Sequence, residues 1–254
     1  MCRHVGYLGS PCAPAELIFN APHSLLLQSY APSDMRGGGT LNADGFGLGW
    51  YGEGGEPLRY RRSAPLWTDD TLPALAASVR TRAFVAAVRN GTPGMPVVEG
   101  ACAPFVDGRW LFSHNGVVAG WPASVAMLAE KLPVTELLTL EAPTDSALLW
   151  ALLRDRLRAG EDPLVAVTDL VATVEAAAPG SRLNLLLTDG EVLVATAWTH
   201  SLSVLSMGDA AVVASEPCGT ERGWTPVPQR HAVRVERGEV AFFEIEYSNE
   251  DRSD

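Results

Sequence analysis

The sequence predicts an α+β protein in which two antiparallel β-sheets are sandwiched between layers of helices. Three observations lead to this fold class. Strand patterns occupy both ends of the 254-residue chain, with two or three helical patterns between them. This order fits two antiparallel sheets better than the strand–helix alternation that builds a parallel sheet. Asp189 and Gly190 separate two strand patterns, and this dipeptide is a strong signal of a hairpin.

The elements of the first half follow from local patterns. Residues 2–8 alternate well enough to predict a strand. Ser24 precedes residues 25–30, which fit a short helix, and it is the expected N-cap of that helix. The glycine-rich segment 36–50 leads into a strand at 46–51, whose glycines allow another backbone to approach closely. Further patterns predict a helix at 71–79 and strands at 83–89 and 109–114.

The second half changes from helix to strand. Helical periodicity predicts helices at 122–132, 145–157 and 163–178. Strands are then expected at 182–187, 191–198, 202–206, 210–215, 232–236 and 239–245. No linker or repeat interrupts residues 2–247, so we expect a single domain there, followed by a frayed polar tail at 248–254.

Composition and charge exclude several classes of function. Lys and Arg number 19 and Asp and Glu 30, and the net charge of −11 argues against nucleic-acid binding, because phosphate contacts need a basic surface. No apolar stretch is long enough to span a bilayer and no secretory signal is present, so we expect a cytoplasmic protein without a membrane partner. The four cysteines form no C-x-x-C and the five histidines no H-x-x-x-H. We therefore expect free thiols, no metal and no cofactor.

Cys2 is the first candidate for chemistry. Removal of Met1 places a thiol and a free α-amino group on the same residue. An α-amine has a pKa of about 7.7–8.0, so it can accept a proton near neutral pH, directly or through a water. A cysteine needs little activation to become a nucleophile. Taken alone, however, a cysteine at position 2 is better explained as coincidence.

Three other motifs offer the groups that such a nucleophile needs. Asn115 and Gly116 close a strand pattern with an Asn-Gly turn, where an amide NH₂ and a backbone N–H can form an oxyanion hole. Arg89 ends a buried strand and is suited to gripping a carboxylate. Asp145 begins a helix and can hold an ammonium group, although such a residue most often only caps its helix. Together with Cys2, these groups fit a γ-glutamyl amide, whose free end carries an α-carboxylate and an α-amine.

This ordered set of motifs resembles the class II, or N-terminal nucleophile, glutamine amidotransferase superfamily. The matching segments cover nearly the whole chain: residue 2 and residues 42–47, 88–94, 113–116, 144–146 and 214–217. The resemblance implies a four-layer αββα sandwich of the Ntn-hydrolase type. It also implies that Cys2 is nucleophile and base, and that Asn115 and Gly116 form the oxyanion hole.

The same resemblance assigns the substrate-binding residues. It implies that Arg89 binds the glutamyl carboxylate, with Thr92 lining the same loop, and that Asp145 binds the α-amine. One position departs from the superfamily, whose members usually have a histidine two residues before this arginine. Here that position is Ala87, which puts the use of ordinary glutamine in doubt.

Several segments are more similar to one group within the superfamily. Residues 1–9, 22–25, 28–29, 34–36 and 92–96 resemble the amidohydrolases of ergothioneine biosynthesis. That resemblance implies a small-molecule substrate, γ-glutamyl-hercynylcysteine sulfoxide, which is cleaved through a thioester on the nucleophile to glutamate and hercynylcysteine sulfoxide. It implies no ATP, metal or redox cofactor.

Two other functions stay open. The glutaminase fold would use the whole chain, so the protein can also be a stand-alone glutaminase subunit that supplies ammonia to a partner synthetase. An inactive Ntn-fold binding module is the third possibility, and the presence of both the nucleophile and the oxyanion donors argues against it. In the hydrolase case, the leaving half carries a trimethylammonium betaine, which aromatic faces and negative charge recognise. Trp50 and Tyr51, beside the glycine-rich segment, are candidates for that contact.

Overall fold

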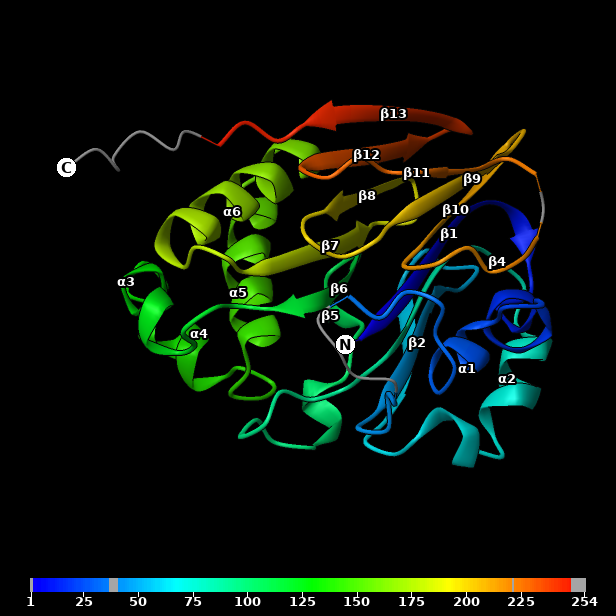
Figure 1. Cartoon of the computed structure of the whole chain (residues 1–254), viewed down its shortest axis with the longest axis horizontal. Helices are drawn as coiled ribbons and strands as arrows, with labels where there is room; N and C mark the ends of the chain where they lie inside the picture. The colour runs from blue at the N-terminus through cyan, green and yellow to red at the C-terminus, as the bar shows by residue number, and fades with distance from the viewer. Residues whose placement is uncertain (1, 37–40, 221, 248–254) are drawn as a thin grey trace.

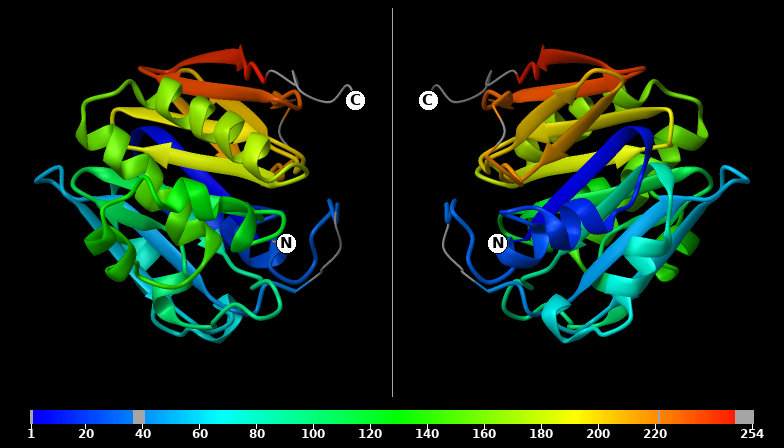
Figure 2. Two further views of the ribbon diagram at one scale, coloured as in Figure 1. Left: turned by 90° about the vertical axis from the view of Figure 1, so that its left-hand side faces the viewer. Right: turned by 90° about the vertical axis from the view of Figure 1, so that its right-hand side faces the viewer.

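The computed structural model describes residues 2–36, 41–220 and 222–247. The predicted removal of Met1 and the predicted fraying of 248–254 lie outside these residues. Two antiparallel sheets are stacked face to face, and helices cover the outer face of each, as Figure 1 and the two side views of Figure 2 show. The predicted α+β fold, a four-layer αββα sandwich, is therefore confirmed.

The first sheet holds the strand that follows Cys2. Its seven strands are ordered β11-β9-β10-β1-β4-β2-β3. They are β1 (Arg3–Cys12), β2 (Phe46–Tyr51), β3 (Pro57–Arg62), β4 (Thr81–Val88), β9 (Ser203–Met207), β10 (Ala210–Ala214) and β11 (Trp224–Pro226). In the register of β1, Arg3 lies opposite Val88 and Val5 opposite Ala214. The start of β1 is thereby fixed between the end of β4 and the end of β10.

The second sheet holds the segment with Asn115 and Gly116. Its six strands are ordered β13-β12-β8-β7-β6-β5. They are β5 (Phe105–Asp107), β6 (Trp110–Val117), β7 (Arg182–Thr188), β8 (Val192–Ala197), β12 (His231–Glu236) and β13 (Glu239–Glu244). β7 and β8 pair across Asp189 and Gly190, so the predicted hairpin is confirmed.

The helices form the two outer layers. In Figure 1, α1 (Leu25–Gln28) and α2 (Leu72–Ser78) lie on the side of the first sheet, and α5 (Asp145–Arg158) and α6 (Pro163–Ala177) cover the second. The remaining helical segments are short: η1 (Glu16–Asn20), η2 (Leu66–Thr68), η3 (Glu99–Ala101), η4 (Ala123–Val125), α3 (Ala126–Ala129) and α4 (Val134–Leu138). The hydroxyl of Ser24 accepts the N–H of Leu27, so the predicted N-cap is confirmed.

Three apolar cores correspond to the three interfaces between four layers. Val85, Leu186 and Val213 belong to the core between the two sheets. The outer cores pack α1 and α2 against the first sheet and α5 and α6 against the second. Because both inner faces are buried, a polar side chain between the sheets is costly unless hydrogen bonds compensate it.

Some elements differ from the sequence-based expectations. The helix expected at 122–132 is divided into η4 and α3, and it ends before Pro133, which disfavours helical backbone at the preceding residue. β3 was not predicted, because Pro57 and three arginines are atypical of a strand, but an edge strand tolerates both. β5, β11 and α4 are short and were not predicted either.

Candidate active site

Cys2 lies beside the loop that follows β4. The N–H of Asn90 approaches its Sγ at 3.5 Å, and the same sulfur lies 3.7 Å from the carbonyl oxygen of Asn90. The side chain is partly exposed. Cys2 and Arg89 line one small cavity together with Ala87 and His114. The fold thus brings together the candidate nucleophile and the candidate carboxylate-binding arginine.

Arg89 is a buried cation without an anionic partner. Its side chain is 9% exposed, and its Nη1 makes one long contact, at 3.5 Å, with the carbonyl oxygen of Asp44. Among the residues that the structure describes, no carboxylate forms an ion pair with Arg89. A buried guanidinium is costly unless it is paired, and its fork of donors matches a carboxylate. This geometry suits the carboxylate of a ligand.

Asp44 holds the loop that carries Arg89. Its Oδ2 accepts the N–H of Gly91 at 2.7 Å, and its own N–H donates to the carbonyl oxygen of Arg89 at 3.0 Å. From the sequence, Asp44 was identified only as part of the matching segment 42–47, and no role was predicted for it. In the structure it holds the backbone at the carbonyl of Arg89 and at the N–H of Gly91, two residues on.

Asn115 and Gly116 do not form the predicted turn. Both lie inside β6, with Asn115 opposite Asn184 and Gly116 opposite Leu183 on β7. The expectation of an Asn-Gly turn was therefore wrong, because pairing with β7 overrides the local turn preference. A Cβ on Gly116 would lie 1.8 Å from the carbonyl oxygen of Arg182, so this close backbone approach requires glycine.

The strand geometry nevertheless leaves oxyanion donors free. The N–H of Leu183 donates to Trp198, away from β6, so Gly116 and Leu183 form a non-hydrogen-bonded pair. The N–H of Gly116 consequently points off the other edge of β6. The side-chain amide of Asn115 donates to the Oγ of Ser215 at 3.2 Å. An amide has two N–H donors, and this contact uses one of them.

Asp145 is a buried anion without a cationic partner. Its Oδ2 accepts the N–H of Val118 at 3.0 Å, and its Oδ1 accepts the N–H of Ser146 at 2.7 Å. Within the described part of the chain no ion pair includes Asp145. The carboxylate therefore has both a capping role in α5 and spare acceptor capacity for an ammonium group.

Thr92 is exposed and does not line the small cavity of Cys2. It faces a neighbouring cavity of about 470 Å³, where Val118 and Trp121 form part of the opposite wall. Val118 is the residue whose N–H binds Asp145. Thr92 therefore lines the same cavity as the residue that binds Asp145.

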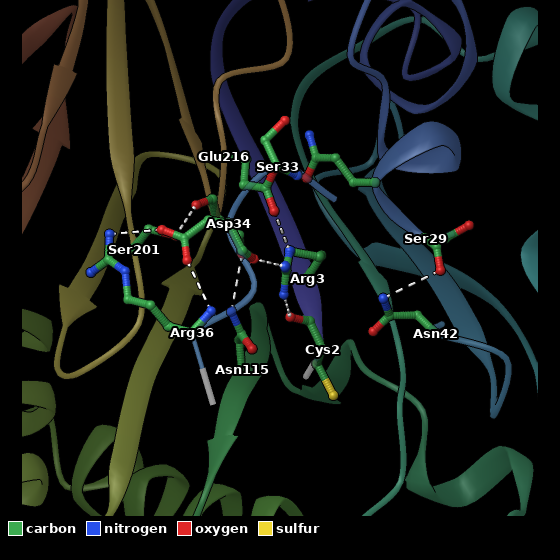
Figure 3. Close-up of polar contacts among 12 residues, drawn as sticks. Cys2, Arg3, Ser29, Ser33, Asp34, Arg36, Asn42, Asn115, Ser201 and Glu216 are labelled. Atoms are coloured by element: carbon green, nitrogen blue, oxygen red, sulfur yellow. Dashed lines mark hydrogen bonds and ion pairs between the residues drawn. The ribbon is translucent and has the colours of Figure 1, made fainter. Parts of the chain in front are cut away.

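Sequence reasoning missed the role of Arg3 and Glu216. Figure 3 places Arg3 between Cys2 and Glu216: its Nε donates to Glu216 at 2.7 Å and its Nη1 to the carbonyl oxygen of Cys2 at 3.0 Å. Glu216 also contacts His23 Nε2 and accepts the N–H of Ser33. The available signal was the matching segment 214–217, which contains Glu216.

Two buried histidines near the site, His4 and His200, are neutral at neutral pH. Burial, and next the proximity of His114, lowers the pKa of His4 to about 3, and burial and the charge of Arg182 lower that of His200 to about 3. No hydrogen bond joins a histidine of the described chain to the Cys2 thiol. These imidazoles are therefore poorly suited to act as the base for Cys2.

Trp50 and Tyr51 lie away from the candidate site. Phe46, at the start of β2, lines the cavity of Cys2, whereas Tyr51 ends the strand at the opposite edge of the sandwich. The hydroxyl of Tyr51 donates to the carbonyl oxygens of Arg109 and Thr188. Neither residue lines the cavity of Cys2, and contact of this aromatic pair with the leaving half stays a prediction.

No group of three or more His, Cys, Asp or Glu side chains among the described residues is arranged to hold a metal ion. None of the described helices has the length and apolar character needed to cross a membrane.

Comparisons with known proteins identify the family of the chain. Residues 15–207 match the glutamine amidotransferases of class II. The chain is 42% identical to the γ-glutamyl-hercynylcysteine sulfoxide hydrolase of Mycolicibacterium smegmatis, over 94% of this chain and 98% of that protein. It is 41% identical to the protein of the same name from Mycobacterium tuberculosis, over 92% of this chain and 93% of that protein.

A solved structure provides an independent comparison of the fold. A glutamine aminotransferase class II domain protein from Silicibacter pomeroyi superimposes with a TM-score of 0.70 and 24% identity, covering 96% of this chain and all of that one. This likeness concerns the fold alone. Sequence match, fold and site geometry agree, and the chain belongs to the class II glutamine amidotransferase family.

Proposed function

We propose that this protein hydrolyses the γ-glutamyl amide of γ-glutamyl-hercynylcysteine sulfoxide to glutamate and hercynylcysteine sulfoxide, and that residues 2–247 act as one catalytic domain. The name shared by the two mycobacterial relatives, at 41–42% identity over more than nine-tenths of this chain, supports the choice of substrate. The reaction class has its own support in the site.

The observation that carries the reaction class is a pair of charged side chains for which the described residues supply no ion-pair partner: Arg89 in the wall of the Cys2 cavity, and Asp145 next to Ser146, which lines the same cavity. Arg89 is a buried cation in the cavity wall that Cys2 shares. Asp145 is buried, and no cationic side chain of the described residues forms an ion pair with it. A glutamyl group carries an α-carboxylate and an α-ammonium, so it would neutralise both side chains at once. This arrangement would place the γ-carbonyl near the Cys2 thiol.

The proposed reaction proceeds through a thioester. The α-amine of Cys2, freed by removal of Met1, accepts the thiol proton, and Sγ attacks the γ-carbonyl carbon. Asn115 and Gly116 donate N–H groups to the tetrahedral oxyanion. The C–N bond then breaks, and the leaving nitrogen takes the proton from the α-amine. A water molecule hydrolyses the thioester, which releases glutamate and restores the thiol.

Ala87 bears on the choice between this substrate and glutamine. It is buried on β4, lies opposite His4 and lines the cavity of Cys2. A methyl group there provides no imidazole to a substrate in the cavity. This supports the hydrolase over the alternative of a glutaminase subunit that feeds a partner synthetase.

A competition assay tests the proposal. Purified protein with a free Cys2 amine is given γ-glutamyl-hercynylcysteine sulfoxide and glutamine together, without ATP, and both amines are quantified by mass spectrometry. We expect kcat/KM for the sulfoxide to exceed that for glutamine by at least a hundredfold. Equal or better use of glutamine would overturn the proposal in favour of the glutaminase.

A further inference from the structure

A cavity of about 700 Å³ is separate from the two cavities described above. None of its lining residues belongs to the segments 87–95 or 114–121, which contribute to the two cavities described above. Its walls come from the loop before the glycine-rich segment and from the ends of β9 and β10. None of the roles assigned above to Cys2, Arg89 or Asp145 involves this cavity.

Two lining residues connect the cavity to the reacting centre. The Oγ of Ser215 accepts a hydrogen bond from the Asn115 side-chain amide at 3.2 Å. Asp34 is joined to Cys2 through Arg3, because Arg3 donates Nη2 to the carbonyl oxygen of Asp34 and Nη1 to that of Cys2. Figure 3 shows Asp34, Arg3 and Cys2 in this order. Ser215 alone therefore separates the cavity from Asn115, and Asp34 and Arg3 separate it from Cys2.

The wall of the cavity carries a dipolar pair of charges. Asp34 Oδ2 and Arg36 Nη2 are 2.7 Å apart, and their side chains are 24% and 51% exposed. Burial alone would raise the pKa of Asp34, but hydrogen bonds from Arg36 lower it, so the carboxylate is ionised at neutral pH. Glu216 also lines the cavity, but its side chain is only 2% exposed and is paired with Arg3, whereas Asp34 and Arg36, paired with each other, are more exposed. Asp34 and Arg36 are thus the charges that face a ligand.

The leaving half of the proposed substrate is dipolar in the same way. Its betaine group carries a permanent trimethylammonium and a carboxylate on the same carbon. A quaternary ammonium donates no N–H hydrogen bond, so it needs aromatic faces or negative charge. No Trp, Tyr or Phe is among the described residues that line the cavity, which leaves negative charge as the available means of recognition.

We propose that this cavity binds the betaine end of the leaving half, with the Asp34 carboxylate against the trimethylammonium and the Arg36 guanidinium against the betaine carboxylate. This inference rests on the proposed function. It makes Asp34 and Arg36 specificity-determining residues, since glutamine and short γ-glutamyl amides have no betaine.

The test compares two substrates that share the γ-glutamyl-cysteine part. Wild-type protein and the Asp34→Asn variant are assayed on γ-glutamyl-hercynylcysteine sulfoxide and on γ-glutamylcysteine. Asn keeps the backbone carbonyl that binds Arg3 but removes the charge. We expect kcat/KM on the betaine substrate to fall by about tenfold or more, mainly through KM, and kcat/KM on γ-glutamylcysteine to change less than about twofold.

A matched control removes an equal charge elsewhere. Asp155 is an exposed carboxylate on α5, and Asp155→Asn should leave kcat/KM on both substrates unchanged. Arg36→Gln, at a half-exposed side chain, is the second variant and should raise KM for the betaine substrate alone. As a direct binding measurement, free Nα-trimethylhistidine should inhibit the wild type competitively, with an inhibition constant raised about tenfold in Asp34→Asn.

The two proposals fail in different ways. If wild-type protein does not cleave the betaine substrate, the proposed function is wrong. If it does, but Asp34→Asn and Asp155→Asn behave alike, or Asp34→Asn lowers kcat/KM equally on both substrates, then the betaine subsite is wrong and the hydrolase stands.

Discussion

Arg3 and Glu216 form an ion pair that is almost completely buried, with Nε and Oε1 2.7 Å apart and the two side chains 1% and 2% exposed. Arg3 immediately follows the candidate nucleophile and binds its carbonyl oxygen. Glu216 follows β10 and also accepts the N–H of Ser33. The position of Cys2 therefore depends on a carboxylate more than 200 residues away in the sequence.

Removing this carboxylate should destabilise the protein strongly. Glu216→Ala leaves a buried guanidinium without its anion, and breaking a buried pair in this way costs about 3–5 kcal/mol. We expect a loss of that size in the free energy of unfolding, measured by urea denaturation. The exposed pair of Arg62 and Glu99, 3.5 Å apart, is the control, and Glu99→Ala should cost no more than about 1 kcal/mol. Similar losses in the two variants would contradict the structural role of Glu216.

The four cysteines should differ in function and reactivity. Cys2→Ala should abolish turnover, whereas Cys12→Ala, Cys102→Ala and Cys218→Ala should retain it. Burial raises the pKa of the Cys102 thiol to about 11, so that thiol should resist alkylation at neutral pH. Iodoacetamide inactivation followed by peptide mass spectrometry checks both points. The α-amine is the proposed base, so full activity in a preparation that retains Met1 would rule out the mechanism.

The local elements were largely predictable, and the contacts between them were not. Phe46–Tyr51 matches the predicted strand because its alternation and its glycines are local properties. The Asn115–Gly116 turn was wrong because β7, some 70 residues later, pairs with both residues. The same limit applies to the site. Arg89 and Asp145 were candidates from residue type and position, but the clamp by Asp44 and the pair with Glu216 depend on packing that no local pattern encodes.

Loss of the proposed oxyanion donor should act on the chemical step. Asn115→Ala removes an N–H that is needed when negative charge develops on the carbonyl oxygen. We expect kcat to fall by an amount equal to about 2.7–4 kcal/mol of activation free energy, with little change in KM. Steady-state kinetics on the γ-glutamyl substrate measures this. An effect confined to KM would show that Asn115 does not stabilise the oxyanion.

Loss of a glutamyl-binding residue should act on binding instead. Arg89→Ala and Asp145→Asn each remove a charge that meets the substrate in both its ground state and its transition state, so KM should rise at least about tenfold. Asn is chosen at 145 because its carbonyl can still accept the N–H of Val118 and so spare the loop. A large fall in kcat with unchanged KM in both variants would contradict these assignments.

Acid should destabilise the protein through its buried histidines. His4 and His200 have pKa values of about 3 in the folded protein, whereas an unfolded histidine has a pKa of about 6.5. Between these values the unfolded chain binds protons that the folded protein does not. The stabilisation is therefore complete above pH 6.5 and is lost as the pH falls toward 3, at about 1.4 kcal/mol per pH unit for each histidine.

Urea denaturation at pH 7 and pH 5 measures this effect above the range in which carboxylates titrate. Over that interval each histidine should cost about 2 kcal/mol of unfolding free energy. His200→Leu, which replaces a buried imidazole with an unpaired Nδ1 by an apolar side chain of similar size, should reduce the loss by about that amount. His231→Gln, on the partly exposed β12, is the control and should keep the wild-type dependence on pH. If His200→Leu showed the same loss as the wild type, His200 would have to take up its proton in the folded protein, and its burial would not be the cause of the acid sensitivity.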